Sequence, residues 1–466
     1  MSLASWAVLT HSRAIAQTVP SLPPTSDPSR IQQQLQPPSP PAPRPFIRVP
    51  RREDLTAPPG ADRQKFRLQE LQIQGATVYS PNRLQKLYAQ LVGKDISLSN
   101  LYLIANRITQ LYRDDGYILS QAIVPAQTIR GGVAKIQVIE GFVERVDFLG
   151  ATKTKLNRLK GFGNKIVASR PLNIKQLERY LLLANELAGI RVRGVLSPGR
   201  SFGGSILTLN VNYKPTNTFI DLNNRGSSTV GPLRSLAALL LNSIFGAGEQ
   251  ITLSGATNPT QTSELANAGL GVSVPVGYEG LRVLLNGSYT NVHPGNDLRK
   301  FDINGNTYFA SLGITYPFIR SRASNLELNG EFDYTNRQVT TLFTGTNETL
   351  SEDRLRVLRV GMNFDRADAH GAWAGDLQIS QGIGGLGATT EGTASRPLSR
   401  SQGSANFTKL TLNLSRLQSL SKNFTLQIAG TAQITGDALL VSEQFGLGGD
   451  EFGRAFDPSQ ILGDSG

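Results

Sequence analysis

The sequence contains no cysteine, only three histidines (His11, His293 and His370) and no long apolar run in its 466 residues. The missing cysteines exclude a disulfide scaffold and suit an oxidising compartment. The few scattered histidines make a zinc site improbable. The longest apolar run, Leu236 to Leu241, is far shorter than the roughly 18 residues that a transmembrane helix needs. If the chain spans a membrane, it must therefore do so with β-strands.

The formal net charge is +12, but the lysines and arginines are scattered, with short clusters only at 44–52 and 153–165. Because no basic stripe forms, a nucleic-acid partner is not expected. The 47 glycines, with abundant Thr, Asn and Ser in the second half, indicate many strands joined by turns. The length predicts two to four structural units, one of which can be a large barrel.

The first 65 residues contain little that can build a core. Residues 1–16 are interpreted as an atypical signal peptide, because Ala14-Ile15-Ala16 suits cleavage although a positive N-terminal region is missing. Residues 17–65 are rich in Pro, Gln and Ser, which predicts an extended linker. A short amphiphilic segment within this linker, 29–36, is predicted to be helical.

A tandem duplication follows the linker. GATVYSPNRL at 75–84 recurs as GATKTKLNRL at 150–159, with six identities in ten positions. The periodicity of both copies predicts two α+β domains, 66–141 and 142–215, with the order strand, helix, helix, strand, strand. Such a domain leaves an exposed sheet edge that can accept a strand from an extended peptide, although a pair of passive spacers is the alternative. The expected strands are 66–75, 117–125, 133–139, 143–150, 190–196 and 205–213, and the expected helices run from Pro81 to a stop at Gly93, from about Leu101 to Gly116, near 156–160, and from about Leu177 to Gly189.

Residues 217–466 alternate apolar and polar side chains in about eleven segments, most of them 9 to 14 residues long. Strands of this length suit a tilted crossing of a bilayer and exceed those of a soluble sandwich, which predicts an antiparallel transmembrane β-barrel. Since single-chain bacterial barrels close with even strand numbers, the expectation is a C-terminally incomplete barrel, from a fragment or a truncated gene product. The charges expected to line a water-filled pore are Arg282, Glu327, Glu331, Asp333 and Arg359.

Two catalytic-looking motifs are better explained as turns. Gly199 to Gly203 matches a nucleophile elbow, but a strand follows it where a helix is needed. Gly382 to Gly387 matches a dinucleotide-binding pattern without a βαβ unit around it. No histidine has an evident acidic partner, so no catalytic residue, metal, cofactor or nucleotide is expected, and the chain is not expected to be an enzyme.

Residues 112–150, YRDDGYILSQAIVPAQTIRGGVAKIQVIEGFVERVDFLG, resemble the two-partner secretion transporters, the TpsB family that exports haemolysins and filamentous adhesins. In that family two POTRA domains precede a sixteen-stranded outer-membrane barrel, so the resemblance implies five further strands and a plug helix, for which 29–36 is the candidate. It also implies that the POTRA domains bind the partner. The residues expected to do so here are Gly116, Tyr117, Leu119, Pro125 and Gln127.

The C-terminal segment GLGGDEFGRAFDPSQILGDSG resembles the family's long sixth extracellular loop, which folds back into the pore and carries the motif V-R-G-F or V-R-G-Y. Arg454 and Phe456 take the positions of the Arg and the aromatic residue, whereas Gly453 replaces Val and Ala455 replaces Gly. Ala455 puts the tight turn in question, because Ala resists the positive φ that Gly allows. In the family an acidic residue from a later strand anchors the Arg. The expected pore-loop residues are Gly453, Arg454, Ala455, Phe456 and Asp457.

The resemblance implies an outer-membrane transporter with periplasmic POTRA domains, which exports a partner protein that is unfolded in the periplasm. Outer-membrane lipid is the other expected partner. The alternatives are a BamA-like factor that inserts other barrels, although such factors usually carry more POTRA repeats, a passive porin, and a soluble β-rich binding protein. Neither the sequence nor the resemblance names the exported partner.

Overall fold

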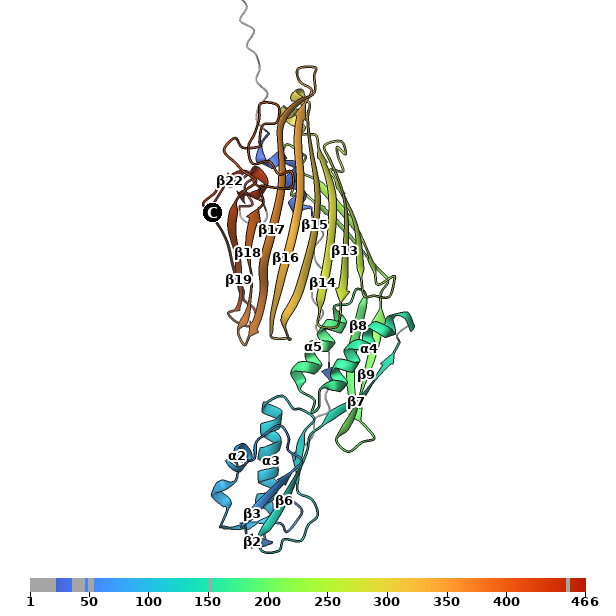
Figure 1. Ribbon diagram of the computed structural model, residues 1–466, viewed down its shortest axis with the longest axis vertical. Coiled ribbons are helices and arrows are strands. Elements are labelled where there is room, and N and C mark those ends of the chain that lie inside the picture. Colours follow the sequence, from blue (N-terminus) through green and yellow to red (C-terminus); the bar gives the residue numbers. More distant parts are fainter. Residues whose placement is uncertain (1–21, 36–46, 49–53, 151–152, 450–452) are drawn as a thin grey trace, which may run out of the picture.

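The computed structural model describes residues 22–35, 47–48, 54–150, 153–449 and 453–466. The chain forms an elongated molecule in which two small α+β repeats follow one another below a large curved sheet (Figure 1). The predicted signal peptide, 1–16, lies outside the described residues. The predicted linker helix is present as α1 (Pro28–Gln34), preceded by η1 (Pro24–Ser26), and it lies inside the curve of the large sheet.

The first repeat builds its core from one amphipathic helix packed on a small sheet. The apolar stripe of α3, including Leu101, Ile104 and Ile108, is fully buried against β6, and the helix stops before Gly116, whose φ of +93° favours glycine. The three-stranded sheet has the order β3-β6-β5, while β2 pairs with β4. The elements are β2 (Lys65–Arg67), β3 (Glu70–Gln74), α2 (Pro81–Gln85), η2 (Ala89–Leu91), β4 (Asp95–Ser97), α3 (Leu98–Asp114), β5 (Gln121–Ile123) and β6 (Val133–Ile139).

The second repeat has the same order of elements, but its sheet contains one additional strand from outside the repeat. β1 (Ile47–Arg48), a piece of the predicted linker, pairs in parallel with the edge strand β8, which gives the order β1-β8-β9-β7. Both helices cover one face of this sheet and bury Leu159, Leu177 and Leu181. The elements are β7 (Phe142–Leu149), α4 (Lys153–Ala168), α5 (Ile174–Asn185), β8 (Ile190–Pro198) and β9 (Gly204–Tyr213).

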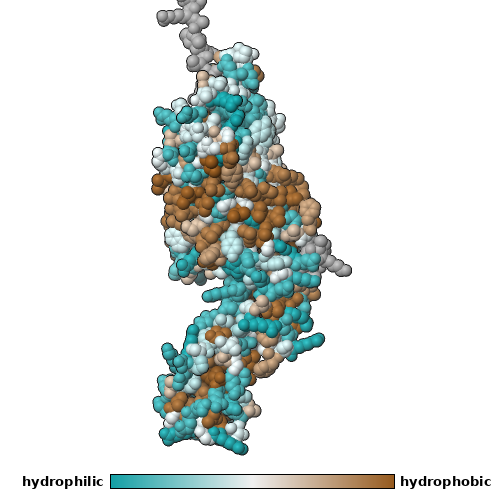
Figure 2. Space-filling view, viewed as in Figure 1, coloured by the Kyte–Doolittle hydropathy of each residue, from teal (hydrophilic) through white to brown (hydrophobic). Residues whose placement is uncertain are grey.

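The large sheet contains eleven antiparallel strands in sequential order, which confirms the predicted number among the described residues. Apolar side chains such as Leu270 and Leu312 are about half exposed on its outer face, and Figure 2 shows a hydrophobic belt at mid-height with hydrophilic surface above and below. Such a belt is typical of a transmembrane barrel. The strands are β10 (Thr216–Asn223), β11 (Arg234–Asn242), β12 (Gln250–Thr257), β13 (Leu265–Val276), β14 (Leu281–Val292), β15 (Ile303–Arg320), β16 (Ser324–Thr341), β17 (Glu348–Asp368), β18 (Gly371–Gly382), β19 (Thr408–Ser419) and β20 (Thr425–Thr435).

A loop segment after β20 folds back beside the sheet. It contains η4 (Val441–Glu443) and the short hairpin of β21 (Phe445–Leu447) and β22 (Ile461–Gly463). Another short helix, η3 (Asn296–Phe301), lies in the loop between β14 and β15. None of the helices in the described part of the chain has the length and apolar character needed to span a membrane.

Several predicted boundaries were wrong. The helix expected near 156–160 extends over the 16 residues of α4, because Gly161 and Gly163 lie inside it instead of ending it. A Cβ at Gly161 would overlap the ring of Tyr278, which packs there from the turn between β13 and β14. The strand predicted for 66–75 is broken into β2 and β3, and that predicted for 117–125 is reduced to β5.

The two catalytic-looking motifs are turns, as expected. Gly199 to Gly203 forms the β8–β9 hairpin, closed by a hydrogen bond from the Gly199 N–H to the Gly204 carbonyl. Gly382 to Gly387 begins the loop between β18 and β19.

Candidate functional site

The helix α1 closes the concave side of the large sheet near the end away from the repeats (Figure 1). Pro28 at its first turn and Asp27 as N-cap favour its start, and Asp27 accepts hydrogen bonds from the N–H groups of Ser29 and Arg30. Ile31 and, directly after the helix, Leu35 are buried against residues of β11 to β14 and of the loop before β11. We call Asp27 to Leu35 the plug helix.

An ion pair fixes the plug helix to the wall. The Arg337 guanidinium on β16 lies 2.6 Å from Asp27 Oδ2, and both side chains are at most 3% exposed. Asp353 on β17 lies 3.6 Å from the same guanidinium. A buried arginine shared by two carboxylates in this way is strongly oriented, and removing one partner leaves a charge without compensation.

The loop after β20 is fixed to the same wall by a second buried cluster. The Glu443 carboxylate accepts hydrogen bonds from Arg359 on β17 and Lys409 on β19, each at 2.8 Å, and its side chain is 5% exposed. Arg359 also contacts Asp333 on β16 at 2.6 Å. The root of the loop is therefore clamped to three strands, and we call these four residues the Glu443 clamp.

The plug helix and the loop contact each other directly. Arg30 donates to the Gln444 carbonyl at 2.8 Å and to Ser459 Oγ at 2.9 Å. Gln33 donates to the Ser442 carbonyl at 3.0 Å. The two segments therefore form one block inside the sheet, so movement of one must break contacts with the other.

The five predicted pore-loop residues form a turn in this loop. The Phe456 N–H donates to the Gly453 carbonyl at 2.9 Å, and Gly453 has the positive φ, +109°. Ala455 is not among the described residues with positive φ, so the alanine is compatible with the turn. Asp457 Oδ2 accepts from the Ser228 N–H at 2.9 Å, which ties the turn to the loop between β10 and β11.

Arg454 lines a cavity of about 980 Å³ together with Glu327, Asp365 and Asp376 from β16, β17 and β18. The anchoring of Arg454 by an acidic residue of a later strand stays a prediction.

The five residues predicted to bind a partner occupy different environments. Gly116 touches Asn173 and Ile174 of the second repeat, and Leu119, only 6% exposed, is part of the core of that repeat. These two residues join the repeats. Tyr117 packs on the core of the first repeat, and Pro125 lies partly exposed beyond β5. Gln127 bonds both the N–H and the carbonyl of Lys135, at 2.7 and 2.8 Å.

A carboxylate at the end of β6 organises the junction of the repeats. Glu140 accepts hydrogen bonds from the N–H groups of Thr77 and Val78, at 2.7 and 2.9 Å, and from the Tyr112 hydroxyl at 2.6 Å. Burial raises the pKa of Glu140, but the hydrogen bonds from Thr77 and Tyr112 outweigh it, so its pKa lies below its usual value. Burial and the bond to Glu140 raise the pKa of Tyr112.

The second repeat is held under the sheet by charged contacts. Glu279, in the turn between β13 and β14, lies 2.7 Å from Lys165 and accepts a hydrogen bond from Tyr180 at 3.2 Å. Glu186 at the end of α5 pairs with Arg320 of β15. The repeat therefore has a defined orientation beneath the open end of the lumen.

The charges on the inner wall were predicted from the sequence, but their partners were not. Arg359 and Asp333 were expected to be solvated by a water-filled pore, whereas both are covered by the loop. Asp27, Arg337 and Glu443 were missed. The signal available was weak: an Asp directly before Pro28 in a linker without other acidic residues between Asp27 and Glu53. In the described part of the chain, no group of three His, Asp or Glu side chains is placed to hold a metal ion.

Comparison with known proteins gives consistent matches. Residues 203–466 match the profile of the haemolysin secretion/activation proteins ShlB/FhaC/HecB, and residues 66–141 match the ShlB-type POTRA domain. The heme/hemopexin transporter protein HuxB of Haemophilus influenzae strain 86-028NP is 23% identical over 398 residues, covering 83% of this chain and 68% of HuxB. The hemolysin transporter protein ShlB of Serratia marcescens is 26% identical over 404 residues, covering 84% and 69%. The solved structure of CdiB from Escherichia coli has the same fold, with a TM-score of 0.70 at 22% identity over 90% of this chain and 76% of CdiB.

Proposed function

Since the chain belongs to the haemolysin secretion/activation family ShlB/FhaC/HecB, it is an outer-membrane transporter that secretes a partner exoprotein, and we propose that the repeats capture this partner unfolded in the periplasm. The captured chain then passes through the lumen of the large sheet to the cell surface. The relatives named after heme/hemopexin and hemolysin transport indicate the kinds of exoprotein that this family handles.

The proposal rests on the edge strand β8 of the second repeat, which pairs with β1, a strand from outside the repeat. β8 accepts β1 as a parallel neighbour, with Ile47 opposite Gly194 and Arg48 opposite Val195. This edge can therefore bind an extended peptide through main-chain hydrogen bonds, which do not depend on the peptide's sequence. An unfolded partner segment would replace β1, and release of β1 would free the segment that leads to the plug helix.

The first repeat offers a second contact region. Pro125 and Gln127 follow β5, an edge strand in the sheet of the first repeat, and Tyr117 precedes that strand. We assign the initial contact with the partner to these residues. Gly116 and Leu119 contribute by keeping the two repeats in one orientation.

Transport requires that the plug helix and the loop give way. The five pore-loop residues, Gly453 to Asp457, lie at the tip of the loop, which Asp457 ties to the loop between β10 and β11, while the Glu443 clamp holds its root. No nucleotide is needed in this scheme, because folding of the exported chain outside the cell prevents its return.

A cross-link between β1 and β8 tests the proposal. The sequence has no cysteine, so Ile47→Cys with Gly194→Cys, opposite each other in the two strands, introduces one defined cysteine pair. Oxidised protein should secrete its exoprotein at least tenfold more slowly, with recovery after reduction. A pair between β5 and β6, Gln121→Cys with Ile139→Cys, is the matched control that leaves β8 unchanged. Unaltered secretion with the first pair oxidised would contradict strand exchange at β8.

A further inference from the structure

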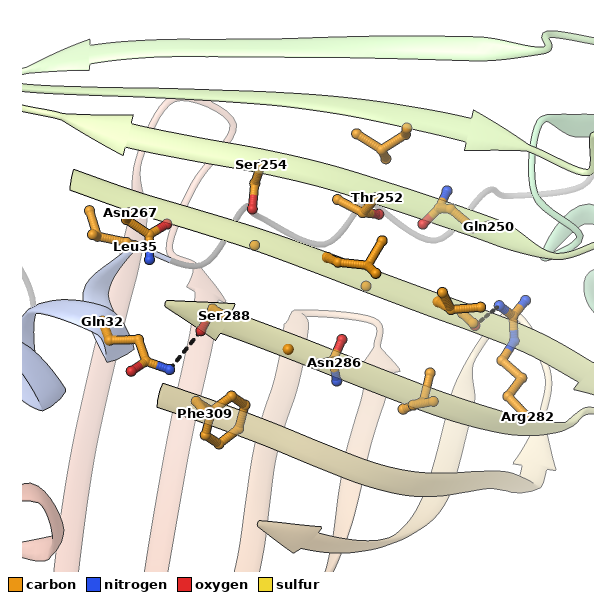
Figure 3. Close-up of a pocket in the computed structure, with 18 residues that line it drawn as sticks. Gln32, Leu35, Gln250, Thr252, Ser254, Asn267, Arg282, Asn286, Ser288 and Phe309 are labelled. Atoms are coloured by element: carbon orange, nitrogen blue, oxygen red, sulfur yellow. Dashed lines mark hydrogen bonds between the residues drawn. The ribbon is translucent and has the colours of Figure 1, made fainter. Parts of the chain in front are cut away.

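A groove follows the inner faces of β12, β13 and β14 from the second repeat to the plug helix (Figure 3). It encloses about 430 Å³, with Gln32 and Leu35 of the plug helix at one end and Arg282 at the other. The Arg282 guanidinium donates a hydrogen bond to the Glu186 carbonyl, a few residues before β8 begins. The groove therefore starts beside the second repeat, at the end of α5 that leads into β8.

The walls of this groove combine polar and apolar groups and are almost without charge. Among the described residues that line it, Arg282 alone is charged. Two glycines leave neighbouring polar groups of the wall uncovered. A Cβ at Gly269 would lie 2.6 Å from Ser254 Oγ, and a Cβ at Gly271 would lie 3.1 Å from Asn286 Oδ1. Hydroxyl and amide groups consequently face an open channel and are not covered by larger side chains.

The other half of the inner wall has the opposite character. The cavity along β16 to β20 is lined by the charged residues Arg320, Glu327, Asp365, Asp376 and Arg454. Glu443 of the loop and Asp27 of the plug helix also bind charged residues on strands of this half. Charged groups in a confined space attract side chains of opposite charge and repel side chains of the same charge. This wall would therefore slow a polypeptide that carries both kinds of charge.

One buried polar atom at the end of the groove has no partner. Gln32 is 8% exposed, and its Nε2 donates to Ser288 Oγ at 2.8 Å. Its Oε1 accepts no hydrogen bond from any described residue. A buried acceptor without a donor is costly, and the N–H groups of an extended peptide in the groove would supply the donor.

We propose that this uncharged groove is the track on which an extended, uncharged stretch of the exported partner lies as it passes from the second repeat to the plug helix. The inference rests on the proposed transport function and specifies which wall carries the chain. Amide and hydroxyl groups exchange hydrogen bonds with successive peptide groups at little cost, since each replaces another of the same kind. The chain can therefore advance without a deep binding minimum.

Two lumen-facing asparagines provide a matched test. Asn267 lies in the groove on β13, and Asn413 lies in the charged cavity on β19. A photo-cross-linking amino acid is placed at either position in the complete gene product. The probe is the exoprotein that disappears from the medium when the gene is deleted, stalled by fusion to a stably folded domain. Cross-links are expected at Asn267, at least fivefold above those at Asn413.

Inserting a charge into the wall is an independent test of the proposed track. Asn267→Asp should slow secretion at least tenfold at unchanged protein level in the outer membrane, whereas Asn413→Asp should slow it less than twofold. Cross-links mainly at Asn413, or normal secretion by Asn267→Asp, would overturn the track while leaving the transport function intact. If deletion removes no exoprotein from the medium, the transport function itself fails, and the track fails with it.

Discussion

Replacing Glu443 by Gln is expected to release the root of the loop after β20 from the inner wall of the sheet. The substitution keeps the size of the side chain but removes the charge that faces Arg359 and Lys409, each 2.8 Å away. Arg359 keeps Asp333 as a partner, whereas Lys409, with a side chain 10% exposed, keeps only neutral oxygen acceptors among the described residues. The variant therefore leaves a buried ammonium group without its carboxylate.

The size of this effect follows from the burial of the pair. Removing one partner of a buried ion pair costs about 3 to 5 kcal/mol. Because about 1.4 kcal/mol corresponds to a tenfold change in an equilibrium constant, the undocked loop should become more populated by a factor of roughly 10² to several times 10³. The plug helix should loosen with it, since Gln33 donates to the carbonyl of Ser442, next to Glu443.

Hydrogen exchange measures this population directly. The amides of 441–447 should exchange roughly 10²-fold faster in Glu443→Gln than in the unmodified protein, because local opening limits their exchange. Glu391→Gln, which changes an exposed carboxylate in the loop between β18 and β19, is the control and should leave these amides unchanged. Exchange within threefold of the unmodified protein in Glu443→Gln would refute the clamp.

Three further outcomes are expected. Arg337→Gln removes the buried partner of Asp27 and should raise the ion conductance of the protein in planar bilayers severalfold, whereas unchanged conductance would show that the ion pair does not hold the plug helix. The pKa of Glu140 lies below its ordinary value in the folded protein. The stabilisation by its carboxylate is therefore present above about pH 4.3 and is lost as the pH falls through the lowered pKa. The melting temperature should fall more steeply with acid in the unmodified protein than in Glu140→Gln, and parallel curves would contradict this role. Gly161→Ala should loosen the second repeat from the sheet and increase protease cleavage between them, and Tyr278→Ala added to it should restore resistance, because the overlap is with that ring; no rescue would place the defect elsewhere.

The strands and the duplication could be predicted because their signals are local and periodic. The alternation of apolar and polar side chains along segments such as β16, Ser324–Thr341, can be recognised from neighbouring residues alone. The strand 133–139 was predicted with its observed ends. Signals of this kind need no knowledge of the tertiary contacts.

The length of α4 could not be predicted, because glycine within a short helical segment normally indicates its end. Gly161 is retained inside the helix because the ring of Tyr278 occupies the space of its side chain. Nothing near Gly161 in the sequence reveals this contact.

The plug contacts were inaccessible for a similar reason. Asp27 and Arg337 are separated by 310 residues, and the amphiphilic pattern of 29–36 predicted a helix but not its place against the wall. The motif around Arg454 could be located by its resemblance to the family loop. The conformation of this motif depends on Gly453, one residue before Arg454. Because Gly453 adopts the positive φ of the turn, Ala455 is unstrained.

The most direct test of the transport function is a comparison of the proteins secreted with and without the gene. Cells that lack it should lose one large exoprotein from the medium, and the complete gene product should restore that exoprotein while other outer-membrane barrels stay at normal levels. An unchanged medium with a general depletion of outer-membrane barrels would contradict the account and would favour a barrel-assembly factor.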